Sequence, residues 1–168
     1  MKEIVYIETS FVSLLVGEPS RDVTVAGNQQ VTRDWWQRRR NVFECVTSQE
    51  TLVEAARGDE RQAALRAAAL AGLPVLTTTT EAAELAGRFM ATGALPAGAG
   101  VDAVHLAVAT LAEADYLLTW NCRHLANAQI LRRLEREAVA RGWKLPKVCT
   151  PLELMGDYPY ETEDESDS

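Results

Sequence analysis

Short apolar segments alternate along this chain with longer segments of helical periodicity. The order predicts strands at 3–7, 41–46, 73–76, 116–119 and 147–149, and helices at 11–16, 21–40, 48–58, 60–71, 81–92, 101–113 and 128–141. Ser10 is expected to cap the first of these helices and Ser48 the third. Strand segments that are apolar along their length are typical of strands buried on both faces of a parallel sheet. The sequence therefore predicts an α/β fold, a three-layer sandwich around a central parallel sheet.

The length of 168 residues and the hydrophobic content of 47% suit one domain with a sizeable core. We expect this domain to cover residues 1–157, since no repeat and no linker divides it. Residues 158–168 form an acidic tail that is expected to be disordered, because such a segment cannot offset the entropy of ordering. The last eight residues carry −5 of the net charge of −7, which leaves −2 for residues 1–160. Charge therefore does not exclude binding to nucleic acid.

No apolar segment approaches the length of a membrane span, and no secretory signal precedes the first strand. We therefore expect a cytoplasmic protein without a membrane partner. The three cysteines, Cys45, Cys122 and Cys149, are odd in number and widely spaced, which indicates reduced thiols instead of a disulfide framework or a zinc site.

Four oxygen-bearing side chains stand where a predicted strand ends or where a predicted helix lies beside such an end. They are Glu8, Glu54, Asp102 and Asn121. The carboxyl ends of parallel strands meet at one edge of a sheet, so these side chains are expected to converge. Carboxylates that share one cleft repel each other unless a cation lies among them, and a hard divalent metal is the usual solution. The pattern favours a metal-dependent hydrolase of phosphate esters.

Each position also has a plain structural explanation. Glu8 is explained equally well by a loop side chain in water or by an acid favoured at a helix start. Taken alone, Glu54 is better explained as an exposed helical glutamate paired with Arg57, and Asp102 as a helix-capping residue. Asn121 could cap a short helix. Four such signals still support a shared site, because the plain explanation would have to hold independently at each position.

The segments 6–10, 54–59, 102–107 and 117–121 resemble the motifs of the PIN-domain family, in particular the branch of VapC-type toxins of toxin–antitoxin pairs. The resemblance extends over about residues 3–155, and the last two segments are its most specific parts. It implies a Mg²⁺- or Mn²⁺-dependent endoribonuclease that hydrolyses RNA. It also implies a cognate antitoxin protein as partner and a homodimer, for which the apolar helices 11–16 and 65–71 offer surface.

Carried onto this sequence, the family's motif residues are Glu8, Glu54, Asp102 and Asn121, of which the three acids would hold the metal. Two of them depart from the family pattern: Glu8 and Asn121 stand where the family usually has aspartate. Three acids suffice for one hard metal and argue less for two. The polar residues expected to line the site are Ser10, Thr119 and His124.

In the mechanism that this resemblance implies, either Asp102 or Glu54 takes the proton of the attacking water. Arg38, Arg39 and Arg40 could contact phosphate, with Trp35 and Trp36 beside them for base stacking; the alternative is that both tryptophans pack in the core and the arginines form a solvated helix end.

His105, one turn after Asp102, is expected to be a buried, hydrogen-bonded histidine and not a ligand. Two other functions stay open. A PIN-like fold that has lost activity and acts as a nucleic-acid or protein binding module is favoured by the amide at Asn121, and a DNA nuclease has the same motifs.

Overall fold

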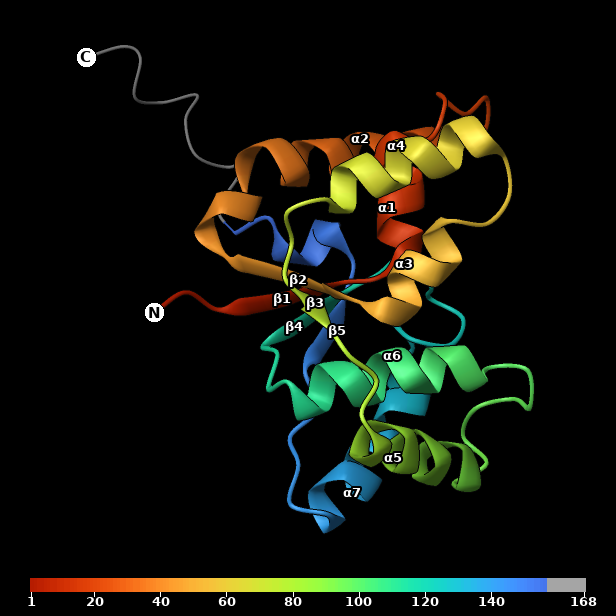
Figure 1. Ribbon diagram of the computed structural model, residues 1–168, viewed down its shortest axis with the longest axis vertical. Helices are drawn as coiled ribbons and strands as arrows, with labels where there is room; N and C mark the ends of the chain where they lie inside the picture. Colours follow the sequence, from red (N-terminus) through yellow and green to blue (C-terminus); the bar gives the residue numbers. More distant parts are fainter. Residues whose placement is uncertain (157–168) are drawn as a thin grey trace.

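The computed structural model describes residues 1–156, which form a parallel sheet between two layers of helices (Figure 1). The five strands are β1 (Ile4–Ile7), β2 (Glu44–Ser48), β3 (Val75–Leu76), β4 (Tyr116–Leu118) and β5 (Lys147–Cys149). Their order in the sheet is β3-β2-β1-β4-β5, and every neighbouring pair is parallel. The expected α/β class with a central parallel sheet is confirmed.

Helices cover both faces of the sheet, with α1 to α4 on one side and α5 to α7 on the other (Figure 1). Their bounds are α1 Thr9–Val16, α2 Val23–Arg38, α3 Gln49–Ala55, α4 Glu60–Leu70, α5 Thr80–Ala91, α6 Gly100–Leu111 and α7 Ala128–Ala140, with short 3₁₀ helices η1 (Arg40–Val42) and η2 (Pro151–Leu154). None of the helices in this part of the chain is long and apolar enough to cross a membrane.

The central strand β1 joins the two halves of the core. Its side chains alternate between the faces of the sheet, so Tyr6 packs with α5, α6 and α7, whereas Val5 and Ile7 pack with α1, α2 and η2. All three side chains are fully buried. The first residue after β1, Glu8, is thereby held at a fixed place on the carboxyl edge of the sheet.

The second strand and the first helix cap differ from the prediction. The strand expected at 41–46 lies at Glu44–Ser48, because Asn41 belongs to η1 and the Glu44 N–H donates to the Glu3 carbonyl at 2.9 Å, which sets the register with β1. Ser10 was expected to cap the first helix. Glu8 takes that place and accepts from the Ser10 N–H. Ser48, as expected, is the N-cap of α3.

The expected domain over residues 1–157 stays a prediction. The predicted acidic tail, residues 158–168, lies outside the described residues.

Candidate metal centre

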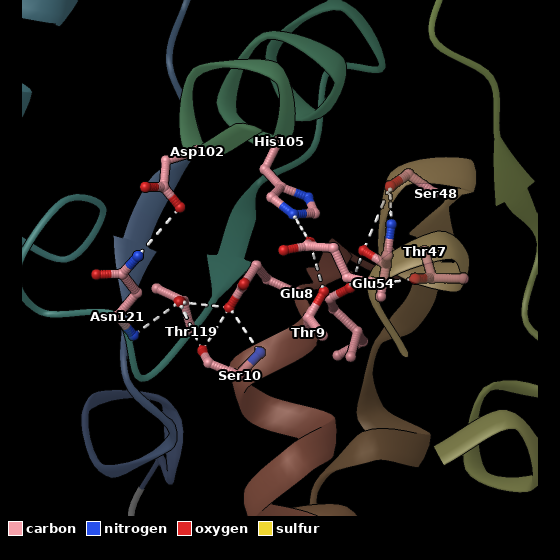
Figure 2. A network of polar contacts seen from close by, with 12 residues as sticks. Glu8, Thr9, Ser10, Thr47, Ser48, Glu54, Asp102, His105, Thr119 and Asn121 are labelled. Atoms are coloured by element: carbon pink, nitrogen blue, oxygen red, sulfur yellow. Dashed lines mark hydrogen bonds and ion pairs between the residues drawn. The ribbon is translucent and has the colours of Figure 1, made fainter. Parts of the chain in front are cut away.

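The chain changes direction across the sheet at β1. It leaves β1 toward β2 on one side and returns later as β4 on the other, so the carboxyl end of β1 lies at a topological switch point, where open α/β sheets bind their ligands. Glu8 directly follows β1, Ser48 ends β2 and Thr119 directly follows β4. Figure 2 shows these side chains together beneath α6.

Glu8 is a buried carboxylate held by neutral donors. It is 4% exposed, and its Oε2 accepts from the Ser10 N–H at 3.0 Å, from the Thr119 hydroxyl at 2.8 Å and from the Ser10 hydroxyl. Within residues 1–156, no group donates to its other oxygen, Oε1. A buried carboxylate is costly unless its charge is compensated, and neutral donors compensate it only in part.

Glu54 lies in the last turn of α3 and faces Glu8. Its Oε1 accepts from the Thr9 hydroxyl at 2.7 Å and from His105 Nε2 at 2.5 Å, while no described group donates to Oε2. Burial alone would raise the pKa of this carboxyl. The bonds from His105 and Thr9 and the nearby positive charges outweigh burial and hold the Glu54 pKa below its usual range. The predicted plain pairing of Glu54 with Arg57 forms no ion pair among the described residues.

His105 connects Glu54 to a buried chain of hydroxyl groups. Its Nδ1 lies 2.7 Å from the Tyr6 hydroxyl, which lies 2.6 Å from Ser48 Oγ. Burial opposes the charged imidazole, but the bond to Glu54 and the surrounding carboxylates raise the His105 pKa above its ordinary value. Burial also raises the pKa of Tyr6, which keeps this hydroxyl protonated. The expectation that His105 is a buried, hydrogen-bonded histidine is confirmed.

Asp102, Asn121 and His124 form a second cluster beside the first. Asp102 Oδ1 accepts from Asn121 Nδ2 at 3.1 Å, and Oδ2 lies 3.0 Å from His124 Nδ1. Asn121 Oδ1 accepts from the His124 N–H at 3.0 Å, which fixes the orientation of the amide and directs its NH₂ group to Asp102. The Asn121 N–H donates to Thr119, the residue that also binds Glu8, so the two clusters are connected.

The expected metal ligands were Glu8, Glu54 and Asp102. The structure brings one ligand atom each of Glu8, Glu54 and His105 within 4.8 Å of one another, a group that contains two of the three expected ligands and not Asp102. Asn121 approaches Asp102 with its amide nitrogen, which cannot bind a metal. Whether Asp102 shares an ion with the two glutamates stays a prediction.

The donor set fits a divalent cation. Two carboxylates each present an oxygen without a described donor, and in residues 1–156 no lysine or arginine forms an ion pair with Glu8, Glu54 or Asp102. Oxygen ligands of this kind suit Mg²⁺ and Mn²⁺, and an imidazole nearby is compatible with Mn²⁺.

Sequence reasoning missed the roles of Tyr6, Thr9 and His105. The useful signal for His105 was its spacing of three residues from Asp102, which places both on one face of α6. The expected lining residues lie at the site: Ser10 and Thr119 bind Glu8, and His124 binds Asp102.

The three arginines do not lie at this site. Arg38 ends α2 and Arg40 begins η1, which leads into the amino end of β2, whereas the acids lie at the carboxyl ends of the strands (Figure 1). These side chains therefore lie away from a phosphate that a metal on Glu8 and Glu54 would hold, and a contact of Arg38, Arg39 and Arg40 with a distant part of a nucleic acid stays a prediction.

The two tryptophans near these arginines belong to the hydrophobic core. Trp35 is fully buried there, and half-buried Trp36 packs against it and under the Arg40 guanidinium. The alternative of core packing is thus the better one, and Trp35 is not available for base stacking.

No protein-family model and no curated protein matches this sequence. Among solved structures, the chain is similar to VapC20 of Mycobacterium tuberculosis, a toxin that cleaves the sarcin–ricin loop. The two are 20% identical, and the match covers 71% of this chain and 91% of that chain with a TM-score of 0.56. At this level of identity the similarity shows the fold, and the chain has the PIN-like fold of that toxin.

Proposed function

We propose that this protein is a metal-dependent endoribonuclease and the toxin of a toxin–antitoxin pair. One observation carries the proposal: two carboxylates, one following β1 and one on α3, face each other at the switch point on the carboxyl edge of the sheet, with no lysine or arginine of residues 1–156 paired to them. Such a pocket requires a cation, and nucleases of phosphodiesters use divalent metals in this way.

Glu8 and Glu54 would hold Mg²⁺ or Mn²⁺ through the oxygens that no described group binds, Glu8 Oε1 and Glu54 Oε2. A cation bound there supplies positive charge for a phosphoryl oxygen and makes an attacking water more acidic. The donors to the opposite oxygens, Thr9, Ser10 and Thr119, orient the carboxylates before the metal arrives.

Asp102 is the better proton acceptor of the two acids that the sequence left open. The lowered pKa of Glu54 makes this carboxylate a weak base and a good ligand. Asp102 stands in the first turn of α6, partly exposed and outside the group of ligand atoms around Glu8 and Glu54, so it is left to accept a proton from a water in the pocket. Asn121 and His124 fix its orientation.

The RNA substrate, the antitoxin and the cytoplasmic location rest on the likeness to VapC20 and on the motifs of the sequence.

A homodimer is also proposed, but of the two helices expected to form its interface only the second supports it. Phe11 and Val12 of α1 are buried in the chain's own core, so α1 offers little for an interface. On α4, Leu65 is exposed and can contribute to one.

The test is cleavage of a structured RNA with Mg²⁺, with Mn²⁺ and with EDTA, beside a DNA of the same sequence. We expect cleavage of RNA with either metal and none with EDTA. If the protein cleaves DNA and not RNA, the proposed function is wrong and the protein is a DNA nuclease. If the protein binds metal and nucleic acid but cuts neither polymer, the binding module that the Asn121–Asp102 contact favours takes its place.

A further inference from the structure

We propose that His105 is a positioning residue, which holds Glu54 so that one carboxylate oxygen is presented to the metal. This inference rests on the metal site of the proposed function. His105 Nε2 binds Glu54 Oε1 at 2.5 Å, and the Thr9 hydroxyl binds the same oxygen at 2.7 Å. Two donors on one oxygen fix the plane of the carboxylate and leave Oε2 open toward Glu8.

The short distance between His105 and Glu54 requires a hydrogen between Nε2 and Oε1. Because Oε1 also accepts from the Thr9 hydroxyl, we assign this hydrogen to Nε2, which donates it to the carboxylate. A ring nitrogen in that state has no lone pair for a metal. In the described arrangement, His105 therefore acts through Glu54 and is not itself a ligand.

The buried hydroxyl chain behind His105 supports this tautomer. Ser48 Oγ accepts from the Thr51 N–H at 3.2 Å and can give its own hydrogen to the Tyr6 oxygen at 2.6 Å or to Thr51 Oγ1 at 3.3 Å, of which the bond to Tyr6 is the shorter and stronger. Tyr6 can then donate its hydrogen to His105 Nδ1 at 2.7 Å, and the ring proton stays on Nε2. Every link has one donor and one acceptor, and the chain ends on Glu54.

Burial makes this arrangement rigid. Tyr6, Ser48 and His105 are all fully buried, and the Tyr6 and His105 rings pack edge to face with centroids 5.9 Å apart. The ring of His105 cannot turn without breaking two hydrogen bonds in a space that water does not reach. Such outer partners typically set metal affinity by about 10- to 100-fold.

The test compares three variants. His105→Gln places an amide N–H near the position of Nε2, His105→Asn is too short to reach Glu54, and Tyr6→Phe removes the donor to Nδ1. Calorimetric titration of the metal-free protein with Mn²⁺ gives the affinity, and RNA cleavage gives kcat and KM. We expect His105→Asn to weaken Mn²⁺ binding by about 10- to 100-fold, and His105→Gln to restore it to within about threefold of the parent.

We expect Tyr6→Phe to fall between these variants, and because it leaves the core filled it serves if His105→Asn does not fold. In the metal-free parent, ¹⁵N NMR should find the His105 proton on Nε2.

Three results would overturn the inference. Equal losses in His105→Gln and His105→Asn would make the imidazole a metal ligand. Unchanged affinity in His105→Asn, or in Tyr6→Phe where only that variant folds, would make His105 a core residue alone. A parent that binds no Mn²⁺ would remove this inference together with the metal site. If the parent binds Mn²⁺ and cuts no RNA, the ribonuclease activity is wrong while the order of affinities still decides the role of His105.

Discussion

The site contains two pairs of histidine and carboxylate that differ in their surroundings. His105 and Glu54 are 2.5 Å apart, with 1% and 27% of their side chains exposed. His124 and Asp102 are 3.0 Å apart, with 24% and 18% exposed. The first histidine comes from a helix packed on the sheet, and the second from a loop after β4. The histidine is thus enclosed in the first pair, which we call the enclosed pair, and partly exposed in the second, the accessible pair, whereas both carboxylates are partly exposed.

This difference suggests a division of labour. A rigid, enclosed pair suits a metal, which requires ligands with fixed directions. An accessible pair suits a water or a substrate that must enter and leave, and its proton can pass to solvent. Four substitutions and one labelling experiment test whether the pairs are divided in this way.

The largest effect is expected for Glu54→Gln. The neutral amide removes a metal ligand from the enclosed pair, so Mn²⁺ affinity should fall by more than about 100-fold and RNA cleavage should disappear. Glu50→Gln, one turn earlier on α3, is the matched control and should leave both unchanged. Full cleavage by Glu54→Gln would place the metal elsewhere.

The next largest effect is expected for Asp102→Asn in the accessible pair. Loss of the proton acceptor should lower kcat by roughly 10²- to 10⁴-fold, the usual contribution of a general base. Mn²⁺ affinity should change little if Asp102 is not a ligand. Calorimetry measures the metal affinity, and single-turnover cleavage measures the chemical step. If Asp102→Asn loses as much metal affinity as Glu54→Gln, Asp102 is a metal ligand too, and both pairs belong to one metal site.

Asn121→Asp should change the response to metal more than the activity. Asn121 Nδ2 donates to Asp102 Oδ1 at 3.1 Å, so a carboxylate in its place meets a like charge. Without metal, we expect the variant to be less stable by about 1–3 kcal/mol. Metal affinity should rise, since a fourth negative charge is added. Thermal unfolding without Mn²⁺ gives the loss of stability, and the rise of the unfolding temperature with Mn²⁺ reports the metal affinity. If Mn²⁺ does not stabilise the variant, the added carboxylate does not contribute to metal binding.

A smaller effect is expected for His124→Ala. A partly exposed pair contributes roughly 0.2–1 kcal/mol, which corresponds to a loss of about 1.4- to fivefold in kcat. His124→Asn keeps a donor near Nδ1 and should recover most of the loss. If His124→Ala loses as much as His105→Asn, the distinction between enclosed and accessible pairs fails.

The last prediction concerns the solvent exposure of the loop that carries His124. The rate of thiol labelling at pH 8 measures this exposure at each cysteine. Burial raises the pKa of Cys45 to about 11 and that of Cys149 to about 12, so almost no thiolate forms at either position. Cys122 is exposed on the loop that carries His124. We expect rapid labelling of Cys122 alone, by mass spectrometry; equally fast labelling of Cys149 would show that the core opens.

The sequence predicted the parallel sheet because its strands are short, apolar and separated by helices. Glu8 and Asp102 were also predictable, since a strand end and the first turn of a helix determine where these side chains lie. Ser48 was predicted as a cap for the same reason. These features depend on local sequence, and local sequence is what periodicity and capping rules describe.

Other features depend on contacts between distant segments. The start of β2 is set by a bond from Glu44 to Glu3, which no local pattern reports. The pairing of His105 with Glu54 joins α6 to α3 across 51 residues. The arginines 38–40 were assigned to nucleic acid by composition, and only the direction of β2 shows that they lie at the opposite edge of the sheet from the acids.

The position of β1 in the middle of the sheet has a consequence during synthesis. Glu8 is synthesised 111 residues before its partner Thr119. At about 5–20 residues per second, that interval lasts roughly 6–22 s. Throughout it, the chain has no complete acidic pocket, because Asn121 and His124 have not been made either. A nascent or prematurely ended chain therefore lacks part of the proposed site.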